Sequence, residues 1–177
     1  MCPKSSGLGL IQVYTGKGKG KTTAALGLAL RAWGRGLRVA VVQFMKMGEE
    51  YGEISALKKL PGIDVFQFGR DRLIIKGKHT EEDVRLAKQG LRKAKESLSG
   101  NYDVVILDEV NVVTDFGIIT PEEVMDIVRS RAPDVEVVMT GRNAPDLFIE
   151  EADLVTEMRM VKHPFESGVL AREGIEY

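Results

Sequence analysis

A turn rich in glycine and lysine, GKGKGKT at residues 16–22, separates an apolar run from an alanine-rich segment. Its three glycines allow backbone N–H groups to converge on an anion, and a helix beginning at Thr23 would direct its N-terminal dipole at the same point. Lys21 can then reach the outer phosphates, and the hydroxyl of Thr22 can ligate Mg²⁺. The turn therefore predicts a nucleoside triphosphate site.

The loop departs from the Walker A consensus G-x-x-x-x-G-K-[ST]. That consensus requires a glycine where this chain has Thr15, and counted from Gly16 the loop is one residue short. The alternative is a flexible surface loop, but a position between strand-like and helical segments favours phosphate binding. We expect a triphosphate to be held in an unusual way. The predicted ATP contacts are Thr15, Gly16, Lys17, Gly18, Lys19, Gly20, Lys21, Thr22 and Thr23.

Composition is typical of one globular domain. The chain has 177 residues, 44% hydrophobic and 29% charged, with a net charge of −1. We expect a flexible tail at residues 1–8 and a single domain at residues 9–177. No apolar run approaches a bilayer span, no signal peptide is evident, and Cys2 is the single cysteine. These features predict a cytoplasmic protein that binds neither membrane nor nucleic acid.

Strand-like and helical patterns alternate along the chain. The expected strands are residues 9–14, 37–45, 63–68, 102–107, 135–139 and 154–161. The expected helices are residues 23–33, 53–60 and 146–151, one capped by Thr80 and ended by Gly100, and one opened by Thr120 and Pro121, with an ordered coil at residues 162–177. This alternation predicts an α/β, P-loop NTPase-like (RecA-like) three-layer sandwich with a mostly parallel central sheet of about six strands.

Two carboxylates follow the apolar run VVIL at residues 104–107. Asp108 and Glu109 should therefore lie at the carboxyl edge of a buried strand, where open α/β sheets bind ligands. A solvated acidic turn is the alternative. Beside a phosphate-binding loop, we interpret the pair as a Walker B element that completes a Mg²⁺ site with Thr22, and Mn²⁺ is a possible substitute.

Further polar residues follow other expected strands. Arg142 could pair with phosphate oxygens, although a lone arginine in a turn is equally compatible with its position. Gln43, Phe44 and Lys46 end another strand and are expected to face the same crevice. Lys46 is thus a candidate for contact with phosphate or with a second substrate.

No protein nucleophile is evident. The two histidines, His79 and His163, do not neighbour a serine or carboxylate in a catalytic arrangement, and no serine elbow is present. The attacking group of any reaction should therefore come from a substrate. The protein would contribute positioning and electrostatic stabilisation of a phosphate.

Several sequence blocks together resemble the ATP:corrinoid adenosyltransferases of the CobA/CobO/BtuR type. The resemblance covers nearly the whole chain from Gly9, and the blocks occur in family order. The blocks are YTGKGKGKTTAA (residues 14–25), VVQFMK (41–46), LDE (107–109), TGR (140–142), VKHPFESGV (161–169) and GIEY (174–177).

The resemblance implies transfer of the 5′-deoxyadenosyl group of ATP to the Co(I) centre of a corrinoid, with release of triphosphate, in adenosylcobalamin biosynthesis or salvage. Co(I) is itself a strong nucleophile, so no protein base is required. ATP would lie reversed in the loop, with its γ-phosphate where other P-loop proteins hold the α-phosphate. Lys21, Thr22 and Glu109 would be catalytic, Thr22, Asp108 and Glu109 would hold the metal, and Arg142 would contact phosphate.

The chain departs from the family at one element. Family members commonly carry Phe-x-Trp before the long helix, where it displaces the lower cobalt ligand. The corresponding stretch here is Leu73-Ile74-Ile75. We expect these residues and Lys46 to face the corrinoid. The resemblance also implies a homodimer and a cellular reductant such as a flavoprotein.

Two other functions fit the motifs. A RecA-like ATPase or switch would form ADP in response to a partner, and a small-molecule kinase would form ADP and a phosphorylated acceptor. Analysis of the nucleotide product separates both from a transferase that releases triphosphate.

Overall fold

The computed structural model describes residues 7–47, 51–72 and 74–176. Within these residues one sheet contains six strands in the order β3-β2-β4-β5-β1-β6, and every neighbouring pair is parallel. The strands are β1 (Ile11–Thr15), β2 (Val39–Phe44), β3 (Ile63–Phe68), β4 (Val104–Asp108), β5 (Glu136–Thr140) and β6 (Leu154–Glu157). The expected parallel sheet is confirmed. Of the tail expected at residues 1–8, residues 1–6 lie outside the described part.

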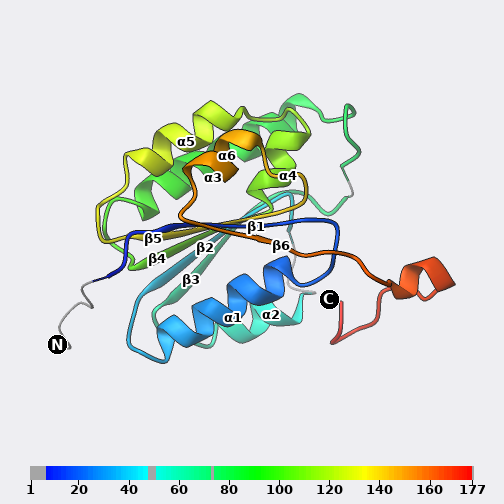
Figure 1. Ribbon diagram of the computed structural model, residues 1–177, viewed down its shortest axis with the longest axis horizontal. Helices are drawn as coiled ribbons and strands as arrows, with labels where there is room; N and C mark the ends of the chain where they lie inside the picture. Colours follow the sequence, from blue (N-terminus) through cyan, green and yellow to red (C-terminus); the bar gives the residue numbers. More distant parts are fainter. Residues whose placement is uncertain (1–6, 48–50, 73, 177) are drawn as a thin grey trace.

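Helices cover both faces of the sheet and produce the expected three layers (Figure 1). They are α1 (Lys21–Trp33), α2 (Gly52–Leu57), α3 (Glu81–Ser97), α4 (Val110–Asp115), α5 (Pro121–Arg129) and α6 (Asp146–Glu151), followed by the 3-10 turn η1 (Pro164–Ser167). Helices α1 and α2 lie on one face, and the other four lie on the opposite face. Because all strands run the same way, their carboxyl ends meet at one edge.

The three central strands are buried along their whole length. Every residue of β2, β4 and β5 is buried, and most are β-branched or otherwise apolar. Strands covered on both faces require such continuous apolar runs. One hydrophobic core lies beneath α3 to α6, and a second lies beneath α1 and α2. The central strands thus form a rigid support for the polar residues at their ends.

Most bounds differ from the sequence-based expectations by one to three residues, and the helix expected at residues 53–60 ends at Leu57. Two elements differ more. Strand β6 ends at Glu157 instead of residue 161, because its partner β1 ends at Thr15, the residue paired with Glu157. Helix α4 was not predicted. Its sequence VNVVTD is rich in β-branched residues and spans only 6 residues, so it carries no helical periodicity.

Capping boxes begin the two helices for which polar start signals were expected. Thr80 and Asp83 form the box of α3, and Thr120 and Glu123 form that of α5, where Pro121 occupies the first turn. In both boxes a threonine precedes the helix and an acidic side chain three residues later accepts a bond from the threonine N–H.

Candidate functional site

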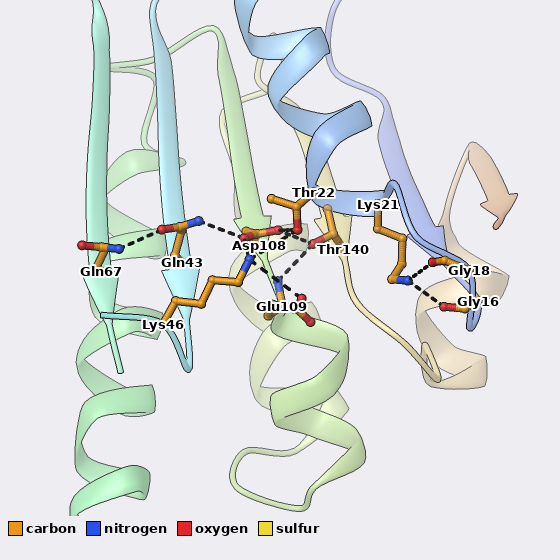
Figure 2. Close-up of polar contacts among 10 residues, drawn as sticks. All are labelled: Gly16, Gly18, Lys21, Thr22, Gln43, Lys46, Gln67, Asp108, Glu109 and Thr140. Atoms are coloured by element: carbon orange, nitrogen blue, oxygen red, sulfur yellow. Dashed lines mark hydrogen bonds and ion pairs between the residues drawn. The ribbon is translucent and has the colours of Figure 1, made fainter. Parts of the chain in front are cut away.

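The glycine- and lysine-rich loop joins the end of β1 to the start of α1. Gly20 caps the helix with a φ of 118°, a conformation that favours glycine. Lys21 is buried, and its Nζ donates hydrogen bonds to the carbonyl oxygens of Gly16 (2.8 Å) and Gly18 (2.7 Å). Figure 2 shows the lysine folded back across the loop. The ammonium group is therefore held inside the turn, beside the N-terminus of α1.

The outer side of this loop packs against the chain that follows β6. The N–H of Gly18 donates to the carbonyl of Met158 at 2.6 Å. A Cβ on Gly16 would lie 2.5 Å from that carbonyl oxygen, and one on Gly18 would lie 2.7 Å from it. The glycines thus allow two backbone segments to approach closely, a role that the sequence did not reveal.

Gly18→Ala is expected to destabilise the protein by about 1–3 kcal/mol and to weaken nucleotide binding, because the new methyl group meets backbone atoms that cannot rotate away. Gly27→Ala is the matched control. Gly27 lies on the exposed side of α1 with nothing within 4 Å of its added Cβ, so alanine should stabilise by about 0.5–1 kcal/mol. Thermal unfolding and ATP titration measure both effects. A Gly18 variant with wild-type stability and affinity would contradict the packing argument.

Asp108, the last residue of β4, is fully buried and accepts hydrogen bonds from four side chains (Figure 2). The donors are Thr22 Oγ1 (2.9 Å), Thr140 Oγ1 (2.7 Å), Gln43 Nε2 (3.0 Å) and Lys46 Nζ (2.9 Å). Burial by itself would raise the pKa of Asp108, but Lys46 and the two hydroxyl donors lower it below its ordinary value. The carboxylate is therefore held ionised and fixed in orientation.

Two residues in this network were assigned no role from the sequence, although Thr140 belongs to the TGR block at residues 140–142. Thr140, at the end of β5, bonds to Asp108 and also accepts the N–H of Glu109 at 3.0 Å. Gln67 on β3 donates to Gln43 at 3.1 Å and so extends the network across a third strand. The sequence signal for both residues is a polar side chain near the end of an expected strand. That signal does not reveal the order of the strands in the sheet, and so it does not show which polar side chains meet.

Glu109 begins α4 in the left-handed backbone conformation, with a φ of 62°. Its side chain is partly exposed and its Oε1 lies 3.9 Å from Lys46 Nζ. Burial and the neighbouring charge of Asp108 raise the pKa of Glu109, whereas Lys46 and Lys21 oppose that rise. Unlike Asp108, Glu109 faces the cavity described below.

Lys46 lies between these two carboxylates. Burial would lower its pKa, but Asp108 and Glu109 raise it above the ordinary value, so the side chain stays charged. Its Nζ is also 3.4 Å from Thr22 Oγ1. Phe44, by contrast, points away from this crevice. Its ring packs into the core so closely that a Cβ on Gly90 of α3 would lie 2.6 Å from it.

A cavity of about 620 Å³ opens beside these residues. Loop residues 17–23, Lys46, Glu109 and Arg142 line it, together with residues 174–176 near the carboxyl end of the chain. Not every predicted ATP contact has its side chain free for this cavity. Lys19 Nζ bonds to the carbonyl of Ile175 (3.0 Å) and to Glu176 (2.9 Å), and the Thr15 hydroxyl accepts the N–H of Ala144.

Comparisons with known proteins agree on one family. The model of the family "ATP:corrinoid adenosyltransferase BtuR/CobO/CobP" matches residues 7–177. The chain belongs to this family. A corrinoid adenosyltransferase of Sinorhizobium sp is 40% identical over 181 residues, which cover 100% of this chain and 84% of the relative. Those of Escherichia coli K12 and Salmonella typhimurium are 38% and 37% identical over 170 residues, 96% of this chain and 86% of each relative.

Two of the three residues at 73–75 that were expected to face the corrinoid are described by the structure, and they differ in their availability to a ligand. Ile74 is 7% exposed and packs in the core with Met45, Phe68 and Val113, so its side chain is buried where contact with a corrinoid was expected. Ile75 is 55% exposed and remains a candidate. Leu73 lies outside the described residues. The apolar side chain of Ile74 thus anchors this segment to the core.

The side chains at the site fit a magnesium ion. Thr22, Asp108 and Glu109 offer hydroxyl and carboxylate oxygens, the donor type that Mg²⁺ prefers, and two carboxylates are the usual protein share of a site completed by phosphates and water. Lys46 pairs with Asp108 at the same place and would have to share that carboxylate with the ion.

In the described part of the chain, every helix is too short or too polar to cross a bilayer.

Proposed function

We propose that this chain transfers the 5′-deoxyadenosyl group of ATP to the Co(I) centre of a corrinoid and releases triphosphate, as a step of adenosylcobalamin formation. Membership of the adenosyltransferase family supports the reaction. The observation in the structure that carries it is the state of Asp108, which four donors hold as an ionised and oriented carboxylate beside the glycine- and lysine-rich loop. Co(I) is itself a nucleophile, so the proposed reaction needs no protein base.

In this reaction the electron pair of Co(I) forms a bond to C5′, and the bond from C5′ to O5′ breaks. The oxygen leaves with the triphosphate, and cobalt becomes formally Co(III). Negative charge grows on the departing triphosphate, so Lys21 and Arg142 stabilise the transition state more than the ground state. Thr22, Asp108 and Glu109 would hold Mg²⁺, or Mn²⁺ in its place, and the ion would neutralise part of the triphosphate charge.

Residues 9–177 act as one catalytic domain in the cytoplasm, with electrons supplied by a reductant such as a flavoprotein. The protein is a homodimer, which is supported by an edge strand that exposes apolar side chains, with Leu154 and Val155 each more than 40% exposed. Sedimentation of the purified protein tests the dimer.

Incubation of the protein with ATP, Mg²⁺ and chemically reduced corrinoid tests the activity. The expected products are a cobalt–carbon bond, seen by its absorbance spectrum, and intact triphosphate. Formation of ADP would instead indicate a RecA-like ATPase or, with a phosphorylated acceptor, a small-molecule kinase.

We expect a preference for corrinoids that lack a bulky lower base. An aromatic wedge excludes the lower ligand at low entropic cost, whereas the aliphatic Ile75 fills less space. Starting from Co(II) and a reductant, cobinamide should react roughly two- to tenfold faster than cobalamin, because an aromatic contact is worth about 0.5–1.5 kcal/mol beyond its area. The control starts from Co(I), which has no axial ligand, and should show no preference. Equal rates from Co(II) would mean that this segment is an adequate wedge or that another part of the chain supplies one.

A further inference from the structure

A buried carboxylate outside the nucleotide site ties down the loop between β3 and α3 (residues 69–80, of which Leu73 lies outside the described residues). Asp83 is in the first turn of α3, and its side chain is 1% exposed. Arg70 Nε donates to Oδ1 at 3.1 Å, and Arg72 Nη2 donates to Oδ2 at 2.6 Å. Oδ2 also accepts the N–H and the hydroxyl of Thr80, each at 2.8 Å. One carboxylate thus binds both ends of the loop.

The two arginines are more than a helix cap requires. Helix α5 begins with the same kind of box, in which Thr120 and Glu123 bond to each other. Within the described residues, the hydrogen bonds of the Glu123 carboxylate include no arginine; its side chain is 42% exposed, and its Oε1 lies 4.0 Å from Lys88 Nζ, at the limit of an ion pair. At α3, Arg70 additionally donates to Thr80 Oγ1 at 2.9 Å, which closes the loop on itself. The arginines therefore constrain the loop beyond capping the helix.

The loop so constrained begins beside the nucleotide site. At Gly69 an added Cβ would lie 2.4 Å from the N atom of Lys46, so the loop starts in contact with the residue that pairs with Asp108. Farther along, Lys76 bonds to Asp115 at the end of α4, at 2.7 Å. Figure 1 shows the loop projecting beyond the sheet at the end where α4 lies. Ile75 is held exposed between these two attachments.

We propose that Asp83, acting through Arg70 and Arg72, is a positioning residue that fixes the β3–α3 loop as a wall of the site for the second substrate. The inference rests on the proposed function, because that second substrate is the corrinoid. Both bonds from the arginines are charge-assisted and directed by a planar group, so they set orientation as well as distance. The loop is then pre-organised before the macrocycle arrives, which lowers the entropy lost on binding.

The test removes the arginine contacts and leaves the helix cap in place. In the double variant Arg70→Gln/Arg72→Gln, the KM for cobinamide should rise about tenfold, less than the roughly 100-fold that a 1 Å misplacement of reacting groups can cost. The KM for ATP should stay within about twofold of the wild-type value, since the double variant leaves the glycine- and lysine-rich loop unchanged. Glu123→Ala is the matched control, because it removes the side chain that accepts the Thr120 N–H in the capping box of α5, and it should leave both KM values at the wild-type level.

Amide hydrogen exchange provides a readout that does not depend on the reaction. In the double variant, amide exchange should be faster across residues 69–80 and unchanged across the glycine- and lysine-rich loop at residues 16–22. In the single variant Arg72→Lys, in which Arg70 is intact, part of the protection of residues 69–80 should be recovered. An unchanged corrinoid KM in a variant whose loop exchanges faster would overturn the proposal, as would an equal rise in both KM values. If the wild-type protein forms no cobalt–carbon bond, the proposed function fails, whereas an active wild type with an unaffected variant refutes the positioning role alone.

Discussion

Lys21→Ala and Thr22→Ala are each expected to reduce turnover by roughly 10²–10³, because a lost charge-assisted contact to the transition state costs on the order of 2–4 kcal/mol. Lys21 lies buried within the loop, and Thr22 Oγ1 donates to Asp108. The proposed contacts of Lys21 with phosphate and of Thr22 with Mg²⁺ should both strengthen as negative charge accumulates on the leaving triphosphate. The measurement is the rate of cobalt–carbon bond formation at saturating ATP.

Arg31→Ala is the control for these variants. It removes one positive charge from the exposed side of the same helix, so turnover should change less than about twofold and stability by less than about 0.5 kcal/mol. Circular dichroism melts would separate lost chemistry from lost folding. Near-normal rates in both site variants would show that the triphosphate binds elsewhere.

Asp108→Asn and Glu109→Gln should differ in what they damage. The first leaves the partly buried ammonium of Lys46 without the buried carboxylate that it pairs with, so unfolding should become easier by on the order of 3 kcal/mol, with turnover lost as well. The second removes a charge that burial disfavours, as the raised pKa of Glu109 indicates. Stability should then stay within about 0.5 kcal/mol of wild type, while the Mg²⁺ concentration needed for half-maximal turnover rises.

Denaturant unfolding and a Mg²⁺ titration of turnover distinguish the two variants. If Glu109→Gln unfolds like Asp108→Asn and shows no separate change in Mg²⁺ dependence, Glu109 has a structural role and Asp108 is the better candidate for the metal. A stable Asp108→Asn protein would show instead that Lys46 finds another partner.

The parts of the fold set by local pattern could be predicted. Residues 63–68 and 146–151 form the expected strand and helix with the expected bounds, because turn residues or a proline flank their apolar patterns. The alternation of strands and helices was sufficient for a parallel sheet. The glycines and Lys21 identified the loop, since local spacing determines where they lie relative to β1 and α1.

Contacts between distant segments could not be predicted. Thr140 meets Asp108 because β5 lies next to β4, and Gln67 reaches Gln43 because β3 lies next to β2. Strand order of this kind follows from packing of the whole sheet. Met158 packs on Gly18 for the same reason, since β6 is the neighbour of β1. The sequence thus indicated which groups carry the chemistry, but not which groups hold them in place.

The central claim is that the bond from C5′ to O5′ breaks, and ATP labelled with ¹⁸O at the 5′ bridging oxygen tests it directly. The protein, Mg²⁺ and reduced cobinamide are incubated with this nucleotide, and the products are analysed by mass spectrometry. Attack of cobalt on C5′ predicts that all of the label leaves in the triphosphate and that the adenosyl group on cobalt contains none. Label retained by the nucleoside, in ADP, AMP or adenosine, would mean that a P–O bond is broken and would contradict the account.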